Sequence, residues 1–370
     1  NRQVMATCLF EYLLINTNRI RIYKMNKKND NVITFLQVVS AFSVIALHTN
    51  SCFWNFDANA GYWFSANIIE SVFYFAVPVF FMISGITLID YQEKYSTKVF
   101  FLKRAKKTLL PYIIWSCIGV FYNLHVGYFS IDTLGIRTVL NGILGGSEII
   151  SVYWFFPCLF CVYLAIPLFA VVDKEKKKEI YRYIILIGIV LNTLIPFINN
   201  VFQLQIEWSY TISVASGYIL WVVIGYVIYK YPMKTFYKVF IGVAGIIGLF
   251  MHICGTYILS IRDGSVNQTF KGYNNLPCIM YSCGIFILLC FIGKKFMKYK
   301  VSQAIVGTIG KYTFPIYLMH WFILDYVVRH FDVDTTSLLW RLGAPIPIGL
   351  VIVGITWIIR KIPILRQIVP

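Results

Sequence analysis

The chain has 370 residues, of which 58% are hydrophobic and 13% are charged. Soluble domains are about half apolar and about a quarter charged, so this composition excludes an ordinary soluble protein and indicates a membrane protein. The net charge of +17 does not indicate a nucleic-acid partner, because the basic residues stand in short clusters between long apolar stretches and form no continuous basic surface.

The N-terminal 24 residues differ in character from the rest of the chain. They contain an apolar patch, Leu9 to Ile15, which is too short to span a bilayer and lacks the small-residue cleavage site of a signal peptide. Met25 is followed by a polar run and then by a long apolar segment, which is typical of a natural start. We expect residues 1–24 to be a non-native or disordered extension and residues 25–370 to form a single membrane domain.

Ten segments contain about the 20 mostly apolar residues that a bilayer-crossing helix needs. They cover residues 32–50, 67–90, 108–126, 150–172, 180–199, 213–230, 239–260, 276–293, 308–328 and 342–360. The sequence therefore predicts an all-α fold, a polytopic membrane bundle of about ten transmembrane helices.

The number of Lys and Arg residues alternates between high and low from one connection to the next. The connections on the side of Met25 hold 23 of them, and the intervening connections hold 5. Because positive charge accumulates on cytoplasmic loops, this alternation predicts ten spans with both termini in the cytoplasm. One missed or invented span would mix the two sets. The chain is thus predicted to be a multi-pass protein of the plasma membrane.

The cysteines do not indicate a metal site. Most of the nine lie inside apolar runs, where a thiol behaves as a small hydrophobe. Cys158 and Cys161 have the spacing of a zinc ligand pair, but no second Cys or His pair stands near them to complete a tetrahedral site. We expect no metal.

Ionisable side chains inside spans are costly, so each is a candidate for function. Gln37 and His48 lie eleven residues apart on the first span, so they share a helix face at about 16 Å along the axis. Ser40 and Val44 lie between them on the same stripe. His48 falls in the outer half of the span.

Other polar groups fall in the outer halves of later spans, and His320 lies nearer the midplane. The outer groups are Glu70, His125, His252, Thr256 and Asp325. A lone intramembrane His often donates to a carbonyl of a neighbouring helix, so we interpret His125 and His252 as structural. Glu70 and Asp325 are either hydrated near the interface or direct participants in function. Tryptophans near span ends, such as Trp54, Trp63, Trp208 and Trp340, are interpreted as interfacial anchors.

Two features lie near the inner ends of the second and third spans. The cluster Lys103 to Lys107 either anchors the protein at anionic lipid or binds the phosphates of a nucleotide-like ligand from the cytoplasm. No P-loop and no Gly-rich dinucleotide fingerprint accompanies it. Ser84 and Gly85, after Pro78, suggest a helix that is broken or closely approached, which is tolerated where it lines a cavity.

Several blocks, taken in order, resemble the acyltransferase-3 family of membrane acyltransferases. The blocks are Phe35 to Ala41 with Ala46 to His48, Val77 to Gly85, Lys103-Arg104 through Pro111-Tyr112, Tyr153 to Phe156, Ile224 to Tyr226, and Ile309 to Tyr312 leading into Ile316 to His320. The resemblance covers about residues 32–360.

The resemblance implies a ten-span protein that moves an acyl group, usually acetyl from acetyl-coenzyme A, to sugars at the cell surface. It implies that His48 and His320 are catalytic. The family pattern has Arg eleven positions before the first His, and this chain has Gln37 there. The predicted substrate-binding residues are Gln37, Ser84, Arg104, Lys107 and Trp154, which lie in these blocks, and Glu70, which is a candidate as an ionisable residue within a span.

The predicted function is O-acyl transfer, most simply O-acetylation, from cytoplasmic acyl-coenzyme A to a hydroxyl of a cell-surface glycan or its lipid-linked precursor. No permanently bound cofactor is expected. The partners are acyl-coenzyme A, the sugar acceptor and membrane lipids, without nucleic acid, and the composition suggests a bacterial source. A transporter or flippase of a polysaccharide or acylated sugar is the alternative, because a bundle with a polar cavity could serve either purpose.

Overall fold

The computed structural model describes residues 31–132 and 134–370. The expectation that residues 1–24 are an extension lies outside these residues. Within the described ranges the ordered elements are all helices, without a strand. This confirms the predicted all-helical fold.

Each of the ten predicted segments coincides with a helix or a chain of helices. The bounds are Asn31–Thr49, α2 Gly61–Phe73 with α3 Ala76–Leu88, α4 Thr97–Arg104 with η3 Ala105–Leu109 and α5 Leu110–Val126, η4 Ser151–Trp154 with α7 Phe155–Ala170, α8 Lys174–Ile189 with η5 Val190–Leu194 and α9 Ile195–Val201, α10 Gly217–Lys230, α11 Thr235–Asp263, α12 Leu276–Phe296, α14 Thr313–His330, and α16 Pro345–Ile359.

Shorter helices connect these elements. They are η1 Ser51–Trp54, η2 Tyr91–Glu93, α6 Ile136–Gly145, η6 Ser213–Ala215, α13 Lys300–Ile309, η7 Gly310–Tyr312, α15 Leu338–Gly343 and η8 Leu365–Gln367.

Seven helical segments in the described chain are long and apolar enough to cross a membrane. Two shorter apolar helices, α10 and α16, have 14 and 15 residues. The protein is therefore a multi-pass membrane protein, while the count of ten crossings and the side of each terminus stay predictions.

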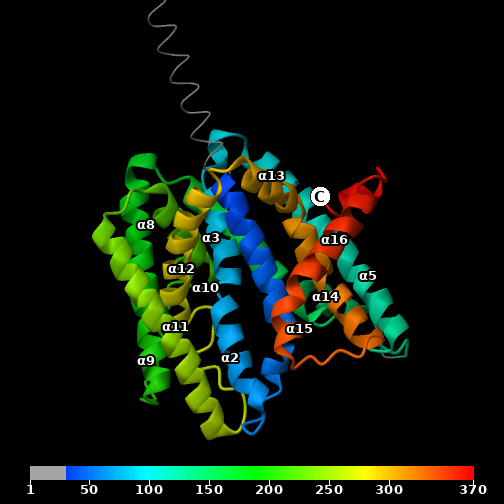
Figure 1. Ribbon diagram of the computed structural model, residues 1–370. Coiled ribbons are helices and arrows are strands. Elements are labelled where there is room, and N and C mark those ends of the chain that lie inside the picture. Colours follow the sequence, from blue (N-terminus) through cyan, green and yellow to red (C-terminus); the bar gives the residue numbers. More distant parts are fainter. Residues whose placement is uncertain (1–30, 133) are drawn as a thin grey trace, which may run out of the picture.

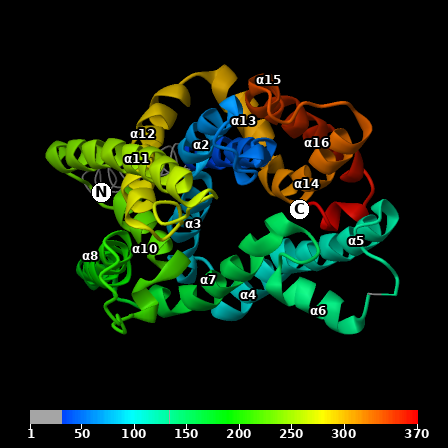
Figure 2. The same ribbon diagram turned by 90° about the horizontal axis from the view of Figure 1, so that it is seen from below.

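The helices run up and down the bundle in three groups (Figures 1 and 2). One group contains α8, α10, α11 and α12, a second contains α14, α15 and α16, and the third runs from α4 to α7. The first helix, drawn in blue, and α3 lie between these groups. The start of the first helix and the C-terminus lie at the same end of the bundle, at the top of Figure 1.

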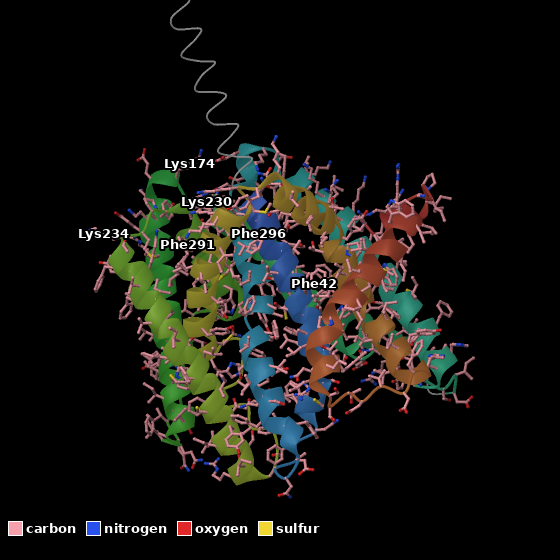
Figure 3. All side chains as sticks on the ribbon, viewed as in Figure 1. Phe42, Lys174, Lys230, Lys234, Phe291 and Phe296 are labelled. Atoms are coloured by element: carbon pink, nitrogen blue, oxygen red, sulfur yellow. The ribbon has the colours of Figure 1, made fainter. Side chains whose placement is uncertain are left out.

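The basic connections gather at that same end. Figure 3 shows Lys174, Lys230 and Lys234 near the top of the bundle, although they come from two different connections. This end is called the basic end below. The arrangement agrees with the alternation of Lys and Arg on which the predicted sidedness rests.

Glycines set the closest helix contact, between α3 and α10. A Cβ atom on Gly85 would lie 1.9 Å from the carbonyl oxygen of Val222, and one on Gly225 would lie 2.4 Å from the Cα of Met82. Small residues let helix backbones approach when lipid provides no hydrophobic drive between helices. Of the two interpretations of Gly85, the close approach is therefore confirmed, and α3 runs through this position unbroken.

Two local features differ from the sequence-based expectation. The second predicted span is interrupted at Tyr74 and Phe75, between α2 and α3, rather than at Gly85. The basic cluster expected in a loop is helical, because α4 continues through a π-helical turn at Ala105–Leu109 into α5. The cluster is helical because Lys, Arg, Ala and Leu all favour helix. The π-helical turn is a separate feature, and such turns often occur at functional sites.

We expect Gly85→Ala to destabilise the protein by about 1–3 kcal/mol, because the added methyl group meets backbone that has no room to move. Thermal unfolding of the purified protein in detergent measures the effect. Gly354→Ala on α16 is the matched control, since a Cβ there meets nothing within 4 Å. Equal unfolding temperatures for the two variants would show that the α3–α10 contact does not limit stability.

Candidate functional site

A cavity of about 390 Å³ lies where the first helix, α2, α3, α10 and α14 meet. Its lining includes two of the polar residues singled out from the sequence, His48 and Glu70, and also Trp154 of η4. Residues 264–275, the loop between α11 and α12, supply a further part of the wall. This loop and η1 belong to the connections with few basic residues, so the cavity lies toward the end opposite the basic end.

His48 and His320 meet beside the cavity, with ring centroids 5.0 Å apart. Nδ1 of His320 lies 2.8 Å from the carbonyl oxygen of Tyr317 and 3.2 Å from that of Ile316. A carbonyl oxygen only accepts, so Nδ1 carries the proton and Nε2 keeps a lone pair. Nε2 of His320 is buried and has no hydrogen-bond partner. His320 is thus held against His48 by its Nδ1 contacts, with its Nε2 unpartnered.

The segment that carries His320 is fixed by two reciprocal tyrosine bonds. The hydroxyl of Tyr153 donates to the carbonyl oxygen of Leu318 at 2.7 Å, and the hydroxyl of Tyr317 donates to that of Val152 at 2.6 Å. These bonds tie α14 to η4, the element that also carries Trp154. Two adjacent residues of η4 therefore have different roles: Tyr153 holds α14 in place, and Trp154 lines the cavity.

Aromatic rings form much of the cavity wall. Tyr74 stacks on Tyr273 with centroids 4.2 Å apart and planes inclined by 5°. Trp154 stacks on the same Tyr273 at 5.4 Å, and Tyr218 lies 6.0 Å from Trp154. Such rings combine flat apolar faces with polar edges. The wall suits a ligand with apolar faces and hydroxyl groups.

A buried ion pair closes the cavity on the side of the 264–275 loop. Nζ of Lys271 lies 2.7 Å from Oε1 of Glu70, and the two side chains are 1% and 5% exposed. The same ammonium lies 3.8 Å from the ring centroid of Tyr74 and 4.8 Å from that of Phe53. Burial lowers the pKa of Lys271, and the carboxylate opposes that shift. The pair tethers the loop to α2.

A buried guanidinium extends this network. Arg341 of α15 donates to the hydroxyl of Ser65 at 2.9 Å and to Oδ1 of Asn50 at 3.5 Å. Asn50 in turn donates to the Ala66 carbonyl oxygen at 2.9 Å and lies 3.4 Å from Oε2 of Glu70. The chain of contacts joins α15, the end of the first helix and α2 beneath the cavity.

The predicted phosphate-binding residues lie elsewhere, at the basic end. The Arg104 guanidinium lies 5.6 Å from the Tyr163 ring centroid, and its Nε is buried without a hydrogen-bond partner. Lys107 is exposed on the π-helical turn, and Nζ of Lys103 lies 3.8 Å from the Tyr95 ring centroid. The structure therefore separates these cations from the histidines.

The remaining predicted binding residues are not in the cavity wall. Gln37 is half-buried on the first helix, toward the basic end. Between it and His48, the Ser40 hydroxyl is buried without a hydrogen-bond partner, and Val44 lines the cavity. The hydroxyl of Ser84 donates to the Phe80 carbonyl oxygen of its own helix at 3.1 Å.

Two interpretations of individual side chains, those of His252 and Trp63, need correction. The sequence predicts that His252 donates to a helix carbonyl, but both of its ring nitrogens are buried without partners, and its ring meets Tyr74 edge-on at 5.0 Å. The interpretation of Trp63 as an interfacial anchor is wrong, because Trp63 is buried. Trp54 is 50% exposed and also lines the cavity, so its interpretation as an anchor stays a prediction. Asp325 accepts from two tyrosine hydroxyls and pairs with Arg329 at 2.9 Å.

Sequence reasoning missed Lys271, Arg341 and the tyrosines of the cavity wall. Lys271 and Glu70 are 201 positions apart, so no local spacing connects them. Both missed cations belong to the five basic residues on the less basic side, and that rarity was the available signal. Among the described residues no group of three His, Cys, Asp or Glu is placed to hold a metal ion.

Comparison with known proteins gives one family. A family model described as an acyltransferase domain matches residues 30–360, nearly the whole of the described chain. No curated protein and no solved structure matches the sequence.

We expect Lys271→Met to destabilise the protein by about 3–5 kcal/mol, because Glu70 would remain buried without a cationic partner. The double change Glu70→Gln with Lys271→Met should recover most of that loss, since it removes both charges. Thermal unfolding in detergent compares the two. Equal destabilisation by the single and the double change would mean that the charges are not coupled.

Proposed function

The chain belongs to the acyltransferase-3 family and is a membrane acyltransferase, and we propose that it transfers an acetyl group from cytoplasmic acetyl-coenzyme A to a sugar hydroxyl. The sugar belongs to a cell-surface glycan or to its lipid-linked precursor. The observation that carries the proposal is the His48 and His320 pair beside a cavity lined by aromatic rings and a carboxylate.

His48 is the general base in this proposal because it is the one of the two histidines that lines the cavity. A neutral imidazole accepts the proton of the acceptor hydroxyl as its oxygen attacks the thioester carbonyl. The carbon–sulfur bond then breaks, and the imidazolium returns the proton to the departing thiolate. The products are the acetyl ester and free coenzyme A, so atoms and charge balance without another reactant.

His320 positions His48. Its Nδ1 proton is engaged by the Tyr317 carbonyl oxygen, which leaves the Nε2 lone pair as a polar neighbour of the first ring. The His320 ring lies against the His48 ring, with centroids 5.0 Å apart, and so restricts how the His48 ring can turn. The reciprocal bonds of Tyr153 and Tyr317 hold this geometry.

The acceptor occupies the aromatic cavity. Trp154 and Tyr218 line the cavity and offer aromatic surface for the C–H groups of a sugar ring. Glu70 and Gln268 supply acceptors and donors for its hydroxyls. Glu70 is held in place by Lys271, so its orientation does not depend on the acceptor.

The donor approaches from the basic end. Arg104 and Lys107 bind the coenzyme A phosphates, because guanidinium and ammonium groups are the usual partners of phosphate and neither side chain takes part in an ion pair found in the described residues. The pantetheine arm then extends from the basic end toward Val44 and His48, which line the cavity. Gln37 gives the first helix a neutral amide where the family pattern has Arg.

This route requires the predicted topology. With ten crossings and both termini in the cytoplasm, the basic end faces the cytoplasm and the cavity faces the cell exterior. Donor and acceptor would then reach His48 from opposite sides of the plasma membrane. A transporter would also need a polar cavity, but the family match favours acyl transfer.

We expect His48→Ala to lower acetyl transfer by a factor on the order of 100 to 10,000, the usual worth of a general base. Turnover of labelled acetyl-coenzyme A by protein in lipid vesicles measures this, with His125→Ala as the control. His125 is an exposed histidine of α5 outside the cavity lining. Full activity of His48→Ala would remove His48 from the chemistry.

We expect Arg104→Ala and Lys107→Ala to raise the KM for acetyl-coenzyme A about tenfold while kcat changes little, because phosphate contacts distant from the reacting atoms contribute uniform binding. Lys98→Ala, an exposed change on α4, controls for the loss of one positive charge. An unchanged KM in both variants would place the donor phosphates elsewhere.

A further inference from the structure

A second cavity, of about 610 Å³, lies at the basic end between α10, α11 and α12. It shares no lining residue with the cavity beside His48. Its walls are mostly aliphatic and aromatic, and include Ile228, Val239, Leu288 and Phe291. Its volume falls in the range of about 300–1,000 Å³ that is typical of ligand sites.

Three lysines belong to the lining of this cavity: Lys230, Lys238 and Lys294. Lys230 pairs with Asp90 at 3.0 Å. Lys238 and Lys294 are exposed, and neither takes part in the ion pairs found in residues 31–132 and 134–370. The cavity therefore combines an apolar interior with two uncompensated positive charges. Figure 3 shows Lys230 and Phe291 close to the basic end.

The outer surface around this cavity is that of a membrane helix. Phe240 of α11 and Phe291 of α12 are 64% and 55% exposed. Large exposed aromatic side chains on helices of this hydropathy face lipid tails. A ligand of the cavity can therefore enter sideways from the bilayer, with its apolar part inside and its charged part at the level of the lysines.

Glycines keep the cavity open. Gly242 of α11 and Gly284 of α12 both line it, and a Cβ atom on Gly242 would meet nothing within 4 Å. The space beside Gly242 is thus not needed for packing of α11 against α12. One turn further along α11, Gly245 and Gly284 do make the close contact, with a Cβ on either lying 3.0 Å from the Cα of the other.

We infer that this cavity binds an anionic glycerophospholipid of the membrane leaflet at the basic end. An acyl chain lies against the apolar wall beside Gly242, and the headgroup phosphate lies between Lys238 and Lys294. Basic pockets between membrane helices on the cytoplasmic side are suited to such headgroups. Neither Arg104 nor Lys107 lines this cavity, so this site is separate from the proposed donor site.

The test measures the unfolding temperature of the delipidated, full-length protein with added phosphatidylglycerol, phosphatidylcholine, inorganic phosphate or coenzyme A. Phosphatidylglycerol should raise it most, because a ligand of the native state stabilises by mass action. Native mass spectrometry of the same samples should show retained phosphatidylglycerol. Equal stabilisation by phosphate or by coenzyme A would overturn the proposal in favour of a soluble phosphate ligand, and equal stabilisation by phosphatidylcholine would show that charge is not recognised.

Two variants distinguish the contribution of the lipid headgroup to binding from that of the acyl chain. Lys238→Ala with Lys294→Ala should weaken phosphatidylglycerol binding roughly 30-fold, from two lysines near an anionic headgroup. Gly242→Leu should abolish retention by filling the apolar part while leaving the charge unchanged. The controls are Lys98→Ala with Lys176→Ala, two exposed lysines outside the cavity, and Gly354→Leu.

The lipid-free variants should unfold at the temperature of the unaltered protein, which separates a lost ligand from a lost fold. Wild-type lipid retention in both cavity variants would overturn the proposal. None of these readouts depends on acyl transfer, so the lipid site stands or falls independently of the proposed enzymatic function.

Discussion

The buried ion pair of Glu70 and Lys271 is the interaction on which the cavity depends. Charges cost free energy in an apolar bundle unless they are paired, so each member of this pair requires the other. Lys271 draws the 264–275 loop onto α2, and that loop carries Tyr273, the ring on which Tyr74 and Trp154 stack. The pair thus holds the aromatic wall of the cavity that His48 also lines.

Much of the fold is a consequence of apolar length alone. Every one of the ten predicted segments coincides with helix, because a segment of about 20 apolar residues has few other ways to satisfy its backbone in lipid. Breaks within helices were less directly predictable. The interruption at Tyr74 and Phe75 contains no glycine and lies before Pro78. Gly85 lies in an unbroken helix, where its lack of a side chain allows α10 to approach closely.

The site was predictable where a residue type is rare and not where it is common. His48, His320, Glu70 and Trp154 were singled out as unusual polar groups in spans or as parts of the family blocks, and the structure gathers them around one cavity. Tyr218 and Tyr273 also line the cavity, but they were not singled out. The chain has 26 tyrosines, and nothing in the sequence distinguishes these two from the others. Lys271 was missed because its partner is distant in sequence.

The two ends of the bundle divide the proposed reaction. In the proposed reaction, cations at the basic end would hold the donor, the aromatic cavity would hold the acceptor, and His48 would act between them. A structure of the protein in a lipid nanodisc with a non-reactive thioether analogue of acetyl-coenzyme A tests this most directly. The account predicts the acyl carbonyl beside His48 and the phosphates at Arg104 and Lys107. An acyl group bound outside the cavity that His48 lines would contradict it.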